Sequence, residues 1–252
     1  MPFIHILILS IVEGLTEFLP ISSTGHLILT SALLKIPSSE YLKAFEIIIQ
    51  FGAILAVVVL YRSHLRWNFE FYKKVFFAFL PAAGVGFLFK DALSTLLSST
   101  LVVAWALIAG GIVLIFMDSI FKKNQESQLT TTKAWLIGLT QCLALIPGVS
   151  RSAATIIGGQ CVGLTREKAA EFSFILAIPT LTAATIYKLW KIREILNISQ
   201  TFDLISGVIL SFIFALLAIR FFIALLNKYG LKYFGIYRII LGVVVLLSNG
   251  RV

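Results

Sequence analysis

Residues 13–26 read EGLTEFLPISSTGH and interrupt an otherwise apolar segment near the N-terminus. Pro20 ends a helix because its ring clashes with the preceding turn, and Ser22, Ser23 and Thr24 are N-cap candidates for the next helix. Residues 147–152, PGVSRS, make a similar break in the second half of the chain. Short apolar segments broken by proline in matching places are typical of discontinuous membrane helices that meet at a binding site.

The composition places this chain in a membrane. Of its 252 residues, 59% are hydrophobic and 13% are charged, whereas a soluble domain is roughly half apolar and a quarter charged. Uncharged runs such as 101–117 and 205–219 approach the ~20 residues that a spanning helix needs. The net charge of +9 does not indicate nucleic acid, because the basic residues lie in short loops between apolar runs. We therefore predict an all-α integral membrane protein surrounded by the lipid bilayer.

Ten apolar segments can be distinguished, six long and four short. The six that we expect to span the membrane lie at about 44–61, 75–89, 101–118, 169–187, 203–226 and 236–249. The four short ones lie at about 3–19, 23–36, 133–146 and 150–164. They form two pairs, each broken by proline, and we expect each pair to be a broken re-entrant helix hairpin.

The two halves of the chain also match in sequence. Residues 14–17 (GLTE) are echoed 124 positions later by residues 138–141 (GLTQ), and each stretch is followed by proline and a serine-rich turn. Such an offset indicates an internal repeat. Each repeat holds one broken hairpin and three spanning helices, and because three is odd the second repeat must be inverted. The two hairpins should then meet near the midplane.

The predicted organisation is a single membrane domain, 1–252, with repeat one at 1–118, repeat two at 133–252 and a cytoplasmic linker at 119–132. Eleven basic residues fall on one side of the membrane: Arg62, Arg66, Lys73, Lys74, Lys122, Lys123, Lys133, Arg166, Lys168, Lys228 and Lys232. Seven fall on the other: Lys35, Lys43, Lys90, Lys188, Lys191, Arg193 and Arg251. Cytoplasmic loops carry the excess of Lys and Arg, so the first hairpin and both termini should be on the outer side, with the head-group site opening to the outer face.

Charged side chains gather at the two breaks. Glu13 and Glu17 are four residues apart and share one helix face. In an apolar segment, two carboxylates need a cation, a shared proton or a polar cavity. Arg151 lies deep in an apolar stretch, since no charge occurs between Lys133 and Arg151, and arginine is a bidentate partner of phosphate. The alternative for Arg151 is a structural ion pair with Glu13 or Glu17.

Together these residues predict a reactive anion site. The starts of two helices present unpaired N–H groups and positive dipole ends. Ser23 is a candidate nucleophile, and His26 is a candidate general acid or base. Two carboxylates can hold a divalent cation that bridges a diphosphate. The predicted ligand is a phosphate-bearing lipid.

The stretches at 13–26 and 147–152 resemble the signatures of the bacterial undecaprenyl-diphosphatase family linked to bacitracin resistance. The resemblance spans almost the whole chain. It implies that the protein hydrolyses undecaprenyl diphosphate to undecaprenyl phosphate and inorganic phosphate in the bacterial plasma (inner) membrane. This reaction recycles the lipid carrier for peptidoglycan synthesis and confers resistance to bacitracin.

The resemblance also implies roles for individual residues. Glu13 and Glu17 would hold a divalent cation, Mg²⁺ or Ca²⁺. The implied catalytic residues are Glu17, Ser23, His26 and Arg151, and the implied phosphate-binding residues are Ser22, Thr24, Ser150, Ser152 and Thr155. Ala153 stands where the family usually has glycine, and we expect its methyl group to crowd a backbone N–H used for phosphate.

These residues leave alternatives open. Either Ser23 attacks the terminal phosphorus, with Glu17 or His26 taking its proton, or water attacks directly. A lipid-phosphate transporter or flippase could use the same anion cage, because inverted repeats are typical of secondary transporters. Paired carboxylates favour the hydrolase, since mere anion binding does not need them. The oligomeric state is also open, with a homodimer among the alternatives.

Overall fold

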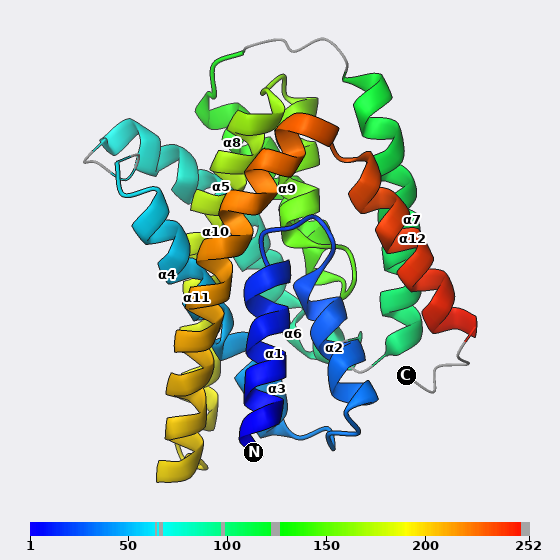
Figure 1. Cartoon of the computed structure of the whole chain (residues 1–252). Coiled ribbons are helices and arrows are strands. Elements are labelled where there is room, and N and C mark those ends of the chain that lie inside the picture. The colour runs from blue at the N-terminus through cyan, green and yellow to red at the C-terminus, as the bar shows by residue number, and fades with distance from the viewer. Residues whose placement is uncertain (64, 66–67, 97–98, 122–126, 248–252) are drawn as a thin grey trace.

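The computed structural model describes residues 1–63, 65, 68–96, 99–121 and 127–247, and these residues form helices and connections without any strand (Figure 1). The elements are α1 (Phe3–Thr16), α2 (Ser23–Leu33), α3 (Glu40–Ile48), α4 (Gln50–Leu60), α5 (Phe69–Leu88), α6 (Lys90–Leu96), α7 (Thr100–Ile120), α8 (Thr131–Gln141), the 3₁₀ turn η1 (Cys142–Leu145), α9 (Arg151–Cys161), α10 (Arg166–Ile192), α11 (Ile198–Tyr229) and α12 (Lys232–Leu247). The predicted all-α class is confirmed for this part of the chain.

Five helical stretches among the described residues are long and apolar enough to cross a membrane. They are α3 with α4, α5, most of α7, α10 and α11, and they match five of the six predicted spans. The sixth, 236–249, falls on α12, whose 16 described residues rise about 24 Å, short of the ~30 Å hydrocarbon core. The sequence also did not predict the short helix α6.

Several sequence predictions fall outside the described residues. Residues 122–126 of the predicted linker and 248–252 at the end of the second predicted repeat are among them. So are Arg66, Lys122, Lys123 and Arg251, which contribute to the predicted orientation.

The four short apolar segments form two pairs of short helices. Helix α1 has 14 residues, and α2, α8 and α9 have 11 each. In Figure 1, α1 and α2 occupy the lower half of the molecule and α8 and α9 the upper half, and the connection within each pair lies near the middle. The two breaks in the sequence therefore come close together in space.

Small residues let the helices that carry the breaks pack tightly. A Cβ atom on Gly14 of α1 would lie 2.6 Å from the carbonyl oxygen of Ser211 in α11. A Cβ atom on Gly138 of α8 would collide with the carbonyl oxygen of Ala78 in α5. Close backbone approach through small residues is a usual source of helix association in membranes. This close packing fixes the end of α1, which Glu17 follows directly, and the end of α8, whose last residue is Gln141.

Candidate active site

Each break ends in a serine that caps the following helix from an unusual backbone conformation. Ser22 has a φ of +73° and its Oγ accepts from the N–H of Gly25 at 3.2 Å. Ser150 has a φ of +75° and its Oγ accepts from the N–H of Ala153 at 3.2 Å. A positive φ is costly for a residue with a side chain and tends to occur at functional sites. The first N–H groups of α2 and α9, which have no preceding turn of helix to accept from them, therefore lie at the two breaks.

Arg151, the first residue of α9, reaches back to the first break. Its Nη2 donates to Glu17 Oε1 at 2.9 Å, and its Nη1 donates to the carbonyl oxygen of Ser173 at 2.8 Å. The guanidinium also lies 5.6 Å from the ring centre of Phe18. The ion pair between Arg151 and Glu17 considered from the sequence is therefore present. Arg151 Nε is buried and has no partner among the described residues, so one donor of the guanidinium is unpaired.

Ser23, the first residue of α2, shares the same carboxylate. Its Oγ donates to Glu17 Oε2, while Oε1 of Glu17 accepts from Arg151. Hydrogen bonding to a base is one way in which a serine hydroxyl is activated as a nucleophile. The three residues form one chain of contacts that links the two breaks.

Glu13 lies one helical turn before Glu17 and is fully buried. Neither of its carboxylate oxygens has a hydrogen-bond partner among the described residues, and it interacts electrostatically with Glu17. A buried carboxylate without a partner is costly, so this position calls for a proton or a cation.

The donor set fits a divalent cation bound together with a phosphorylated substrate. Mg²⁺ commonly takes one or two carboxylates, with phosphate and water oxygens completing its shell. Glu13 and Glu17 supply two such carboxylates. Within the described part of the chain, no group of three or more His, Cys, Asp or Glu side chains could hold a metal ion, so an all-protein cage is not available there.

A cavity of about 370 Å³ is lined by Glu17, Ser23 and Arg151, whereas Glu13 is not among its lining residues. The predicted site residues that line it are Glu17, Ser22, Ser23, Thr24, Ser150 and Arg151. Apolar side chains form another part of its wall, among them Leu27, Ile28 and Leu145. The cavity also reaches Lys90 and Lys191, whose side chains are exposed. Polar and apolar side chains therefore line the same cavity.

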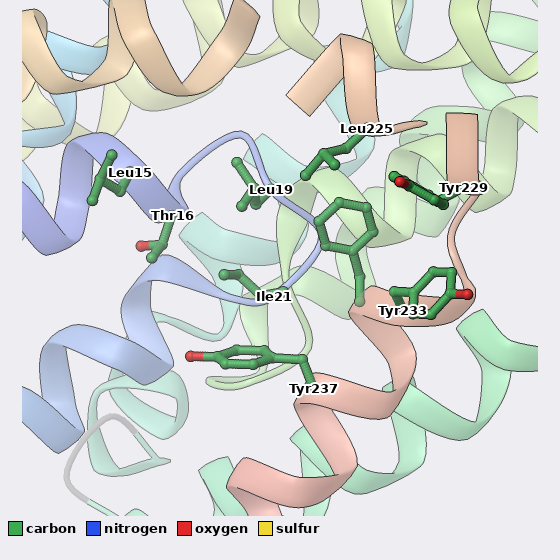
Figure 2. Close-up of a pocket in the computed structure, with 9 residues that line it drawn as sticks. Leu15, Thr16, Leu19, Ile21, Leu225, Tyr229, Tyr233 and Tyr237 are labelled. Carbon is green, nitrogen blue, oxygen red and sulfur yellow. The ribbon is translucent and has the colours of Figure 1, made fainter. Parts of the chain in front are cut away.

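His26 is not among the residues that line this cavity. Its Nδ1 lies 2.7 Å from the carbonyl oxygen of Ser22, and its Nε2 lies 2.7 Å from the hydroxyl of Tyr237, whose ring stacks on it. Tyr237 lines a second, largely apolar pocket of about 640 Å³, between the end of α1 and the α11–α12 junction (Figure 2). The structure thus places His26 beside that pocket, and its predicted catalytic role stays a prediction.

Ser152 and Thr155 also lie outside the cavity lining, and their hydroxyls are occupied within the protein. Ser152 Oγ donates to the carbonyl oxygen of Leu19 at 2.7 Å, which ties the second break to the first. Thr155 Oγ1 lies 2.6 Å from Ser173 Oγ, beside the guanidinium of Arg151. The N–H of Ala153 donates to Ser150 Oγ and so caps α9. These contacts hold the site together.

Arg238 of α12 is the residue that the sequence reasoning missed. It is fully buried, and its guanidinium donates to five backbone carbonyl oxygens. Three of these acceptors belong to the breaks: Pro20 at 3.1 Å, Gly148 at 2.9 Å and Val149 at 2.9 Å. The sequence did contain a signal for Arg238, which is the one charged residue in the apolar segment 236–249. Ionisable residues in membrane segments are usually functional.

Comparison with known proteins agrees with this arrangement. Residues 6–244 match the family model described as Bacitracin resistance protein BacA. The chain belongs to the BacA family. Among curated BacA relatives, the protein of Bdellovibrio bacteriovorus named undecaprenyl-diphosphatase is 49% identical over 252 residues, covering 98% of this chain and 96% of that protein. The undecaprenyl-diphosphatase of Aquifex aeolicus is 50% identical over 242 residues, 94% of each chain. The resemblance seen at 13–26 and 147–152 is confirmed.

Proposed function

We propose that this protein removes the terminal phosphate from undecaprenyl diphosphate, yielding undecaprenyl phosphate and inorganic phosphate. The observation that carries the proposal is the chain of contacts from Arg151 through Glu17 to Ser23, in a cavity lined by both polar and apolar side chains. Such a cavity suits a diphosphate on a prenyl chain, and relatives across nearly the full length are named undecaprenyl-diphosphatase. The product returns as lipid carrier for peptidoglycan synthesis, which accounts for resistance to bacitracin.

In the proposed reaction, Ser23 Oγ attacks the terminal phosphorus and Glu17 Oε2 takes its proton. The bond from that phosphorus to the bridging oxygen breaks, and undecaprenyl phosphate leaves. Water then hydrolyses the phosphoserine and releases inorganic phosphate. Glu17 is preferred over His26 as the base because Ser23 donates to Glu17. Arg151 Nε and the N–H groups at the two helix starts stabilise the charge of the transferred group.

A divalent cation, Mg²⁺ or Ca²⁺, held by Glu13 and Glu17 would neutralise diphosphate charge when bound. The experiment that tests the function measures phosphate release from undecaprenyl diphosphate by the purified protein in detergent, with and without EDTA. We expect release that EDTA abolishes and that added Mg²⁺ or Ca²⁺ restores, with Glu13→Gln strongly impaired. No release from well-folded protein would favour lipid-phosphate transport instead.

Ser23→Ala should lower phosphate release by at least about a thousandfold, because a nucleophile that is removed cannot be replaced by binding alone. Acid quench of the wild-type reaction followed by mass spectrometry should detect phosphate on Ser23. Ser206→Ala is the control, since the hydroxyl of Ser206 donates to backbone carbonyl oxygens of its own helix, α11, those of Phe202 and Asp203. Full activity in Ser23→Ala would rule out the serine and leave direct attack by water.

The finer architecture in this proposal is a pair of inverted repeats, 1–118 and 133–252, within one membrane domain. Helix α1 of the first half packs on α11 of the second, and α8 of the second packs on α5 of the first. Likewise α4 packs on α11 and α10 packs on α5. The matching turns at Ser22 and Ser150 also support two related re-entrant hairpins that meet near the midplane.

We place the opening of the site at the outer face of the bacterial plasma membrane. Four lysines line the cavity, Lys43, Lys90, Lys188 and Lys191, and all belong to the group predicted to face outward. The phosphate assay repeated on sealed vesicles of known orientation tests this. Substrate confined to the outer leaflet should be hydrolysed, and hydrolysis confined to substrate in the inner leaflet would reverse the orientation.

A further inference from the structure

Gln141 is a buried donor without an acceptor at the wall of the site. It is the last residue of α8, is 2% exposed and lines the cavity that holds Glu17 and Arg151. Its Oε1 lies 3.3 Å from Thr180 Oγ1, whose hydroxyl also donates to the carbonyl oxygen of Leu176 at 2.9 Å. Its Nε2 has no hydrogen-bond partner among the described residues. Buried polar groups are normally paired, so a donor left open beside a cavity points to a ligand that carries an acceptor.

The chemistry at this position differs from that at its counterpart in the first half. Gln141 ends the GLTQ stretch as Glu17 ends the GLTE stretch. An ionised carboxylate only accepts hydrogen bonds, whereas the amide of glutamine offers two N–H donors. A second carboxylate of the Glu17 kind would repel a diphosphate, while an amide can bind one. Arg151 also lines this cavity, and its buried Nε has no partner among the described residues, so two lining residues each carry an unpaired donor.

We propose that Gln141 binds substrate, with Nε2 donating a hydrogen bond to a phosphate oxygen of the diphosphate. Through this hydrogen bond, the part of the site that the second half of the chain contributes prefers an anionic head group. This inference rests on the proposed function, because the substrate supplies the diphosphate. It makes Gln141 a binding residue, whereas Glu17 at the matching position acts on the proton of Ser23.

The test compares Gln141→Met and Gln141→Glu with Gln160→Met. Methionine keeps the length of the side chain but removes the donor, and glutamate keeps the shape but replaces the donor with a charge. Gln160 is the matched control, because it is 3% exposed and its Nε2 also lacks a partner among the described residues, yet it does not line the cavity. Thermal melting without ligand establishes that each variant is folded.

Two readouts are measured: the KM for undecaprenyl diphosphate, and the Kd for inorganic diphosphate from its stabilisation of the protein against heat. A hydrogen bond to a charged group corresponds to a change of about tenfold to a hundredfold. We expect Gln141→Met to weaken both constants by that factor, Gln141→Glu to weaken them further, and Gln160→Met to leave both within about twofold.

A wild-type KM and Kd in Gln141→Met would overturn the inference. The same result in Gln141→Glu would also overturn it, because glutamate keeps the side-chain oxygen but lacks the amide donor. The binding readout separates this inference from the proposed function. Loss of diphosphate affinity in Gln141→Met supports the role of Gln141 even if the wild type released no phosphate. Phosphate release by a Gln141→Met variant with wild-type KM would refute the role of Gln141 and leave the hydrolase intact.

Discussion

Replacing Arg151 with lysine should lower phosphate release by at least about a thousandfold. The guanidinium makes two directional contacts, since Nη2 donates to Glu17 and Nη1 donates to Ser173, and its buried Nε has no partner among the described residues. Lysine carries the same charge on a single nitrogen and cannot reproduce a planar fork. Loss of one preorganised donor to a transition state costs about 10²–10³ in rate, and misplacement of Glu17 adds to that loss.

The measurement is the rate constant for phosphate release at saturating undecaprenyl diphosphate. Arg193→Lys is the control, because Arg193 is an exposed arginine whose guanidinium contacts the carbonyl oxygen of Trp190 and the carboxylate of Glu194. It should keep the wild-type rate. If Arg151→Lys kept most of the rate, a point charge would suffice and the directional role of the guanidinium would be wrong.

Replacing Arg238 with leucine should destabilise the protein and disorganise both breaks. Five carbonyl oxygens would lose their donor, and each unsatisfied buried group costs about 1–3 kcal/mol. The sum is comparable with the 5–15 kcal/mol that stabilises a typical protein. We therefore expect the melting temperature in detergent to fall by more than about 10 °C and phosphate release to be lost. Lysine has three donors, so Arg238→Lys should lie between leucine and wild type.

Arg220→Leu is the matched control for Arg238→Leu, because Arg220 is an exposed arginine on the membrane helix α11. Its melting temperature should stay within about 2 °C of the wild type, in line with the small effects of most surface substitutions. A melting curve for Arg238→Leu that matches that of Arg220→Leu would contradict the proposed role of Arg238 in holding the two breaks together.

Local chemistry made much of this fold predictable. Proline and serine act on the backbone within a few residues, so the sequence predicted the breaks near Pro20 and Pro147 and helix starts at 23 and about 150, close to the observed Ser23 and Arg151. Hydropathy predicted five of the long helices for the same reason, since burial in lipid depends on composition over about 20 residues. The family signatures are also contiguous stretches, which is why the family could be identified before the structure.

The geometry of the site depends on residues far apart in the chain, and only the tertiary structure decided it. Arg151 meets Glu17 across 134 positions, and Arg238 meets Pro20 across 218. His26 reached Tyr237, 211 residues away, and lies outside the lining of the cavity. Residue types and spacing showed which side chains were costly to bury. Which of them became partners followed from how the fold brings Arg151 of α9 and Arg238 of α12 to the first break.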